Sequence, residues 1–385
     1  MNQPAQAASL SSPSVLDSAG LAAPAALETP LLTALRLKTP EISAAAYRGA
    51  RAATVFSSPA QELRALLSSV GVYDLGWRTG IACTGEDRVR WLNGMVTNHV
   101  GALTENHGCY AFVLNAQGRI QGDLNIYQRG DALWLDTDIA QAETLTTFLD
   151  RFIIMDDVTL DPLPTMTRLG IAGPHAVALL TQIGLAAEGL EPLQMRALEW
   201  RGNAVTLVAA HSPLTPRMEL WIPQSAVQPL WQTLLEAGAI ACGATAIEDL
   251  RILEGTPAYG TDIKQRDLPQ ETNQARALHF TKGCYLGQEI VERIRSRGNV
   301  HRTFSGFVLG ADFATEGVAA AEKTPILADD QSVGDITSAA KITLPDGRVQ
   351  VFALGYIRRE ALDRKSALHC NGSVAAPSAL PFLSQ

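Results

Sequence analysis

The stretch Lys282-Gly283-Cys284-Tyr285-Leu286-Gly287-Gln288-Glu289 is the most distinctive part of this sequence. It follows Leu268-Pro269-Gln270-Glu271-Thr272-Asn273 within a long segment rich in glycine, proline and charged residues. Gly283 and Gly287 permit a tight backbone and the close approach of a ligand or partner. Residues Gln288–Arg295 predict a short helix, because acids stand early and arginines late, as the helix dipole favours. Long ordered loops of this kind are more often functional than structural.

Cys284 precedes the predicted helix, and Lys282 lies two residues before it. A cation and a helix N-terminus both favour the thiolate, so this position indicates a reactive cysteine. The alternative interpretation is a small buried thiol in a turn, because free cysteines are among the most buried residues. The sequence leaves both open.

The charge of this segment differs from that of the whole chain. Between Arg276 and Arg302 there are six basic and two acidic residues, whereas the chain as a whole has a net charge of -8. A local excess of arginine suits a polyanionic tail, such as folate polyglutamate, or an RNA phosphate backbone. A solvated helix face with internal ion pairs explains the same pattern.

The rest of the chain divides into three parts. Residues 1–55 are rich in Ala, Ser and Pro and are expected to form a mobile leader. Residues 56–302 are expected to form an α+β region with two αβ subdomains, about 56–165 and 166–250, closed by the loop 251–302. Short strands and turns predict a small β-barrel over residues 303–385.

Within the α+β region, strands are predicted at Cys109–Asn115, Arg119–Tyr127 and Ala132–Asp136. Their short, turn-like connections predict antiparallel pairing. A helix is expected at Ala140–Phe152, and an alternating strand at Met218–Ile222.

Composition and missing motifs exclude several classes of protein. The 385 residues are 46% hydrophobic and 18% charged, which excludes a wholly disordered chain. There is no apolar run of 18 residues, so no membrane span is expected, and no secretory signal is evident. Neither a dinucleotide-binding glycine motif, a P-loop nor a serine-hydrolase elbow occurs. Five scattered cysteines without zinc spacing predict a reducing, cytoplasmic protein with no intrinsic metal site.

The motif Lys282–Glu289, together with Leu268–Asn273, resembles the signature of the YgfZ family of folate-binding proteins. These are relatives of the glycine-cleavage T-protein, an aminomethyltransferase. The resemblance covers about residue 60 to the end. It extends to Val72-Tyr73-Asp74-Leu75, Gly85-Glu86-Asp87, Leu92-Asn93-Gly94, Thr97-Asn98, Leu114-Asn115, Gly118-Arg119-Ile120, Leu250-Arg251, Gly255 and Val333-Gly334-Asp335-Ile336-Thr337-Ser338. It implies an aminomethyltransferase-like folate-binding fold with antiparallel sheets, helices and a C-terminal β-barrel.

The resemblance also implies roles for individual residues. Glu219 stands where the relatives carry a Glu that pairs with the pterin ring, although an outward-facing strand residue is an equal alternative. Arg251 corresponds to an Arg that contacts the carboxylate-bearing end of folate; the alternative is an ion pair with Glu248 or Glu254. Asn115 and Asp123 are expected to line the folate pocket, as are Lys282 and Tyr285, while Gly283, Gly287, Gln288 and Glu289 shape the motif loop.

One departure bears on activity. The aminomethyltransferases carry two adjacent acids in the first hairpin, whereas this chain has Gly122-Asp123. The leading hypothesis is therefore a tetrahydrofolate-binding protein in iron–sulfur cluster assembly or repair that supports radical tRNA-modifying enzymes. Cys284 would be its reactive group, held ionised by Lys282. Iron–sulfur client or assembly proteins are the partners that this hypothesis implies.

Two alternatives remain. One is a folate-dependent aminomethyl or methyl transferase with Asp123 as the acid/base group. The other is a tRNA-associated adaptor that uses Arg293, Arg295, Arg297 and Arg302, although the acidic net charge argues against nucleic acid as a direct ligand. A single cysteine cannot hold a stable cluster alone, so any cluster would be shared with another thiol source.

Overall fold

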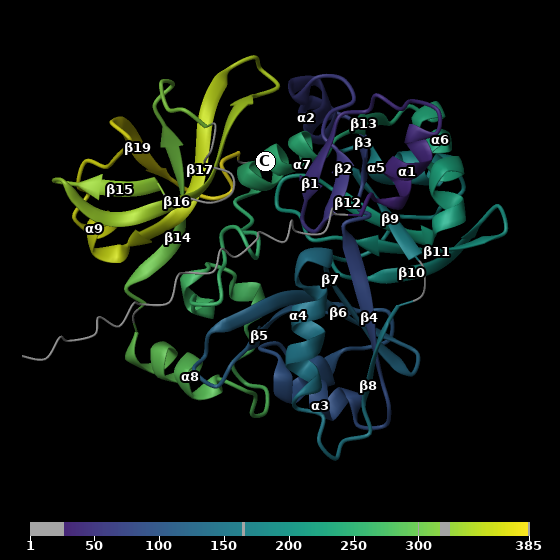
Figure 1. Ribbon diagram of the computed structural model, residues 1–385, viewed down its shortest axis with the longest axis horizontal. Coiled ribbons are helices and arrows are strands. Elements are labelled where there is room, and N and C mark those ends of the chain that lie inside the picture. Colours follow the sequence, from purple (N-terminus) through teal and green to yellow (C-terminus); the bar gives the residue numbers. More distant parts are fainter. Residues whose placement is uncertain (1–26, 164–165, 299, 316–323, 384–385) are drawn as a thin grey trace, which may run out of the picture.

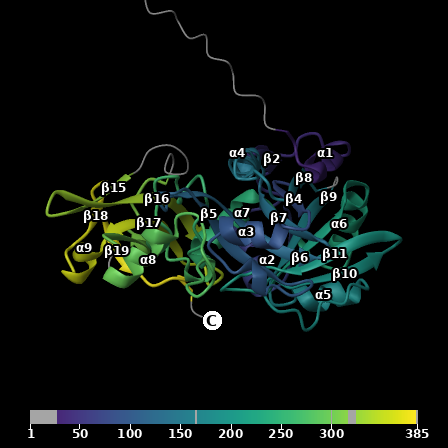
Figure 2. The same ribbon diagram turned by 90° about the horizontal axis from the view of Figure 1, so that it is seen from below.

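The computed structural model describes residues 27–163, 166–298, 300–315 and 324–383. Two mainly antiparallel sheets lie side by side, and a β-barrel formed by the C-terminal part of the chain packs beside them (Figures 1 and 2). This is the expected α+β architecture with a C-terminal barrel. Among the described residues, no helix is long and apolar enough to cross a membrane.

The first sheet has six strands in the order β10-β11-β12-β9-β3-β13. All its pairs are antiparallel except β3 with β13. The sheet differs from the predicted division at residue 165, because β3 comes from before that boundary. The bounds are β3 Gly71–Asp74, β9 Met166–Ala172, β10 Met195–Trp200, β11 Asn203–Ala209, β12 Arg217–Pro223 and β13 Ile240–Cys242.

The second sheet has five strands in the order β5-β6-β7-β4-β8 and is antiparallel throughout, as the short connections predict. Its core is made by apolar residues from the sheet and from α3 (Arg88–Met95) and α4 (Ile139–Asp150). The strand bounds are β4 Arg78–Thr84, β5 Gly108–Leu114, β6 Ile120–Arg129, β7 Ala132–Asp138 and β8 Thr159–Pro162.

The C-terminal barrel closes in the order β14-β17-β16-β15-β18-β19, which removes free strand edges. Helix α7 (Ala244–Glu254) is buried along most of its length between the six-stranded sheet and this barrel. The barrel strands are β14 Arg302–Leu309, β15 Thr324–Ala328, β16 Gln331–Thr343, β17 Val349–Arg358, β18 His369–Cys370 and β19 Ser373–Ser378.

The remaining helices cover the sheets and the loops. Helices α5 and α6 pack on one face of the six-stranded sheet, while α2 and α7 pack on the other. The predicted short helix after the motif is α8, which begins at Gln288 as expected. The bounds are α2 Pro59–Ser68, α5 Ala176–Gln182, α6 Val227–Glu236, α8 Gln288–Arg297 and α9 Arg359–Asp363.

The prediction of a mobile leader over residues 1–55 needs correction. Residues 1–26 lie outside the described part of the chain, but α1 (Pro30–Arg36) and the hairpin β1 (Ala44–Tyr47) and β2 (Ala50–Ala53) are folded elements. Leu31 and Leu32 are buried in the core. These elements are too short to show a period in the sequence, and tertiary packing stabilises them instead.

A buried ionic cluster joins the two sheets. Asp136 on β7 accepts hydrogen bonds from Arg78 on β4 and from Arg168, which comes from β9 of the other sheet. Asn125 Nδ2 donates to the same carboxylate at 3.0 Å, and the Arg168 guanidinium lies 3.9 Å from the centre of the Trp221 ring. Burial opposes ionisation of Asp136, but the two arginines hold its pKa below its usual value.

We therefore expect Asp136→Ala to destabilise the protein by about 3–5 kcal/mol, because it leaves the buried Arg168 and the half-buried Arg78 without their shared partner. Urea unfolding followed by circular dichroism measures this change. Asp346→Ala is the control, since Asp346 pairs with Arg348 at the exposed turn between β16 and β17. Equal unfolding midpoints for the two variants would show that the cluster does not hold the sheets together.

Candidate functional site

A polar cavity of about 160 Å³ lies where the two sheets, α7 and the β1–β2 turn meet. Its walls combine five arginines with four carboxylates and several aromatic rings. The charged residues that line it are Arg48, Arg78, Arg217, Arg251, Arg276, Asp123, Asp138, Glu219 and Glu254. Of the sequence-predicted site residues, the cavity brings together Asp123, Glu219 and Arg251.

Glu219 belongs to a row of residues that crosses three strands. The register pairs both Tyr73 on β3 and Glu219 on β12 with Gly170 on β9. A Cβ atom on Gly170 would lie 2.2 Å from the Tyr73 ring, so glycine is needed for the ring to lie across the sheet. Glu219 is half-buried, and its carboxylate accepts a hydrogen bond of 2.9 Å from Trp221 Nε1. The outward-facing alternative for Glu219 is thus wrong.

Two buried polar groups beside Glu219 have no hydrogen-bond partner within the described part of the chain. These are the Tyr73 hydroxyl and Nε of Arg217, and both residues line the cavity. Arg217 and Glu219 stand two residues apart on β12 and share a face of the strand. Because buried polar groups are nearly always hydrogen-bonded, the wall formed by Tyr73, Arg217 and Glu219, here called the inner wall, has hydrogen-bonding capacity that the described residues leave unused.

Asp123 comes from β6 of the opposite sheet. Its two carboxylate oxygens accept hydrogen bonds from the Tyr110 hydroxyl at 2.6 Å and from Gln141 Nε2 at 2.7 Å. Burial raises the pKa of Asp123, and these two hydrogen bonds oppose the rise. A carboxyl of this kind holds a proton more readily than an exposed one, as an acid/base group requires.

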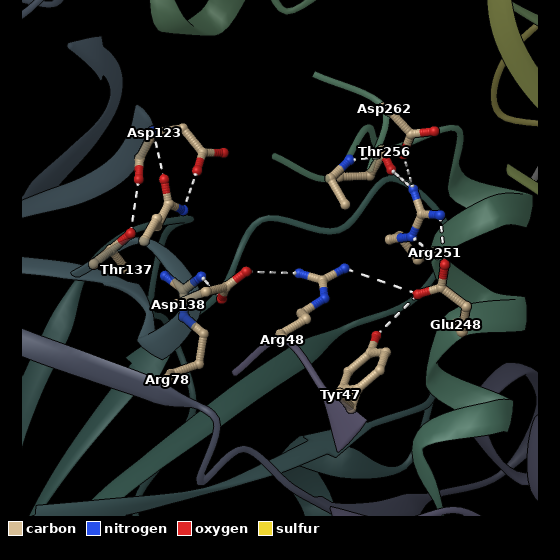
Figure 3. Close-up of polar contacts among 12 residues, drawn as sticks. Tyr47, Arg48, Arg78, Asp123, Thr137, Asp138, Glu248, Arg251, Thr256 and Asp262 are labelled. Carbon is tan, nitrogen blue, oxygen red and sulfur yellow. Dashed lines mark hydrogen bonds and ion pairs between the residues drawn. The ribbon is translucent and has the colours of Figure 1, made fainter. Parts of the chain in front are cut away.

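A line of alternating charges borders the cavity (Figure 3). Arg78 Nη1 lies 2.8 Å from Asp138, and Arg48 bridges Asp138 at 3.4 Å to Glu248 at 3.9 Å. The Tyr47 hydroxyl also donates to Glu248, at 2.9 Å. These contacts connect the β1–β2 hairpin to the five-stranded sheet through Asp138 and to helix α7 through Glu248.

Arg251 continues that line but has no donor left for a ligand. Its guanidinium donates to Glu248 through Nε and Nη2, to the Thr256 carbonyl and Asp262 through Nη1, and to Ser338 Oγ through Nη2. These contacts use all five N–H groups of an arginine. Arg251 is therefore better described by the alternative interpretation, an ion pair within the protein. Its two carboxylate partners are Glu248, as expected, and Asp262 in place of Glu254.

Asn115 does not line the cavity. Its side-chain oxygen accepts hydrogen bonds from the backbone N–H groups of Gln117 and Arg119, at 3.0 and 2.9 Å. It therefore shapes the turn between β5 and β6. Asparagine is common in such turns for this reason, and the hairpin position alone could not separate this role from ligand binding.

Lys282 and Cys284 are not arranged as predicted. The Lys282 ammonium donates to the backbone carbonyls of Asn93, Val96 and Asn98, so it anchors the loop after α3 instead of facing the thiol. Burial lowers the pKa of Lys282 to about 8. Cys284 is exposed, which excludes the buried-thiol alternative, and it is not part of the cavity wall.

The other motif residues build the loop. Tyr285 packs in an apolar cluster under the β5–β6 hairpin and is absent from the cavity wall, contrary to its predicted folate contact. Gln288 accepts a hydrogen bond from the Tyr285 N–H at 3.1 Å, whereas Glu289 is exposed. Gly287 has a φ of +82°, and a Cβ atom there would lie 2.5 Å from the Asn115 carbonyl oxygen. The motif thus packs the start of α8 closely against the turn between β5 and β6.

Sequence reasoning missed several wall residues. Tyr47 and Arg48 fall in the supposed leader, and His211 lies in a segment without a motif. Tyr73 belongs to one of the stretches that resemble the family, but no role was assigned to it. Burial, and then the charge of Arg276, lowers the pKa of His211 to about 4, so this imidazole is neutral near pH 7.

Within the described residues, no group of three or more His, Cys, Asp or Glu side chains could hold a metal ion.

Residues 34–282 match the family described as the GCVT N-terminal domain. The chain belongs to this family. The aminomethyltransferase of Nostoc is 24% identical over 302 residues, which cover 74% of this chain and 76% of that protein. A putative chloroplastic transferase of Arabidopsis thaliana is 24% identical over 309 residues, 80% of this chain and 69% of that protein.

A solved structure shares the fold. The glycine cleavage system aminomethyltransferase T from Bartonella henselae superposes with a TM-score of 0.81, with 93% of this chain and 98% of that chain covered, at 19% identity. The fold is thus that of the T-protein superfamily, as the sequence resemblance implied.

Gly283 and Gly287 provide a test of the close packing between the start of α8 and the β5–β6 turn. We expect Gly287→Ala to destabilise the protein by about 1–3 kcal/mol, because the residue needs a positive φ and has no room for a Cβ atom. Gly283→Ala is the matched control, since its Cβ atom would meet nothing within 4 Å. Thermal denaturation measures both variants, and equal losses of stability would contradict the assignment of Gly287 as the structural glycine.

Proposed function

We propose that this protein binds tetrahydrofolate in the central cavity, with the pterin ring against the inner wall. The observation that carries the proposal is the pair of unpartnered buried groups, the Tyr73 hydroxyl and Arg217 Nε, beside the Glu219 carboxylate. Water alone could fill such a space, but a flat heterocycle with donors and acceptors on one edge would satisfy all three groups together.

The donor and acceptor types fit a reduced pterin. A carboxylate at Glu219 accepts two N–H bonds from an aminopyrimidinone edge, and such charge-assisted bonds are stronger than neutral ones. Arg217 and Tyr73 would supply donors to the ring's oxygen and nitrogen acceptors. Membership of the GCVT family and similarity to proteins named aminomethyltransferase support the same ligand.

Anaerobic calorimetric titration of tetrahydrofolate tests this proposal. We expect saturable binding by the wild type and a loss of at least about tenfold in affinity for Glu219→Gln, because the variant loses a charged acceptor. Glu199→Gln is the matched control, since Glu199 is an exposed residue of β10 in the same sheet.

The titration has two adverse outcomes. Absence of binding by folded wild-type protein would overturn folate binding. If Glu219→Gln and the wild type bind tetrahydrofolate with equal affinity, folate binding stands, but Glu219 does not contact the pterin ring.

We further propose that the folate-bound protein acts in iron–sulfur cluster assembly or repair. The YgfZ-like motif supports this role, and its cysteine is exposed at the surface, where a partner protein could reach the thiol. Other ligands would have to come from that partner, because clusters are usually held by several thiolates.

A second candidate is folate-dependent one-carbon transfer. The observation that favours it is Asp123, a buried carboxyl in the cavity wall whose pKa is raised. An acid/base group at this place would exchange a proton with the ligand during transfer. In this role Cys284 would have no part, because it stands outside the cavity wall.

The two roles predict opposite effects of Cys284→Ala and Asp123→Asn. For cluster maintenance, Cys284→Ala should fail to restore the activity of an iron–sulfur enzyme in cells lacking the native gene, while purified protein shows no transfer from an aminomethyl donor to tetrahydrofolate. For transfer chemistry, the purified protein should turn over, Asp123→Asn should reduce the rate by about 10²-fold or more, and Cys284→Ala should leave it unchanged. If Cys284→Ala restores the activity of the iron–sulfur enzyme in these cells, Cys284 has no part in cluster assembly or repair.

A further inference from the structure

One cavity arginine differs from the other four in having no carboxylate partner. Within the described ranges of the chain, no Asp or Glu oxygen lies within 4 Å of the Arg276 guanidinium. The other four all form ion pairs: Arg48 with Asp138 and Glu248, Arg78 with Asp136 and Asp138, Arg217 with Glu254, and Arg251 with Glu248 and Asp262.

The neighbouring groups do not neutralise Arg276 either. His211 is held neutral near pH 7 by burial and by Arg276 itself. Asp123 also lines the cavity, but its carboxylate accepts its hydrogen bonds from Tyr110 and Gln141. Arg276 therefore brings an uncompensated positive charge to a half-buried position in the cavity wall.

Arg276 is also held in place. Its backbone carbonyl accepts a hydrogen bond of 2.9 Å from Asn98 Nδ2, and its guanidinium carbon lies 4.1 Å from the centre of the Tyr110 ring. Among the residues that the structure describes, only a long contact of 3.4 Å, from Nε to Gln274 Oε1, uses one of its side-chain donors. Stacking restrains the plane and leaves both terminal nitrogens for a ligand, so little side-chain entropy is lost on binding.

We propose that Arg276 binds the carboxylate-bearing end of the folate ligand. The inference rests on the proposed folate function and assigns to Arg276 the role that the sequence resemblance gave to Arg251. Planar guanidinium groups recognise carboxylates through two parallel N–H bonds. Arg251 cannot do so because its five donors are occupied. Arg276 has a stacked plane and, among the described residues, no counter-ion and no partner for its terminal nitrogens.

The experiment compares two ligands that differ at the acidic end. Tetrahydrofolate carries the aminobenzoylglutamate group, and 6-methyltetrahydropterin lacks it. We expect Arg276→Gln to weaken tetrahydrofolate binding by about tenfold or more in anaerobic calorimetry, because a charge-assisted pair is lost. Affinity for 6-methyltetrahydropterin should change less than about twofold, a distinction that a merely structural role of Arg276 would not produce.

Arg295→Gln is the matched control. Arg295 stacks on Phe280, with 4.6 Å from its guanidinium carbon to the ring centre, but lies on α8 outside the cavity. This variant should bind both ligands as the wild type does. Thermal denaturation of each variant checks that it is folded.

Three outcomes would overturn the inference. If Arg276→Gln weakens both ligands equally, Arg276 supports the wall and does not contact the acid. If neither affinity changes, it has no part in binding. If the wild type binds the pterin and tetrahydrofolate with equal affinity, the acidic end contacts no arginine, although folate binding stands. Binding of neither ligand by the wild type would instead overturn the proposed function, and the inference with it.

Discussion

The structure depends on one buried carboxylate that belongs to two sheets at once. Asp136 of the five-stranded sheet binds Arg78 of its own sheet and Arg168 of the six-stranded sheet. A buried charge is tolerated only when partners surround it closely, so the two sheets cannot separate or slide without a large cost. The cavity lies beside this joint. Its opposite walls, with Glu219 on one and Asp123 on the other, are therefore held at a fixed separation.

The charges around the cavity fall into two groups. One group holds the frame: Arg48, Arg78 and Arg251 are engaged with carboxylates from β7, from helix α7 and from the loop that follows α7 (Figure 3). The other group comprises Arg276, which has no ion-pair partner among the described residues, and the Tyr73 hydroxyl and Arg217 Nε, which have no hydrogen-bond partner there. In the proposed complex the free energy of ligand binding would come from the second group, because a ligand gains little from donors already in use.

Sequence reasoning located the elements of the fold better than the roles of side chains. The strands around Asp123 and Met218–Ile222, the helix after Gly287 and the terminal barrel were all expected. Lys282 was misjudged because nearness in sequence suggested a contact with Cys284, whereas its flexible stem reaches three carbonyls from another segment. Arg48 was missed because it stands in the turn between two four-residue strands, which are too short to show a recognisable period.

The sequence by itself determined the local structure and the T-protein superfamily. Alternating strands, short turns and the positive-φ glycine at Gly287 are properties of neighbouring residues. Only the tertiary structure decided which charges remain free. The resemblance singled out Arg251, but Asp262 and Ser338 reach Arg251 from distant segments. No carboxylate oxygen within the described ranges lies within 4 Å of the Arg276 guanidinium. Ion pairing depends on distances across the fold, which no local pattern records.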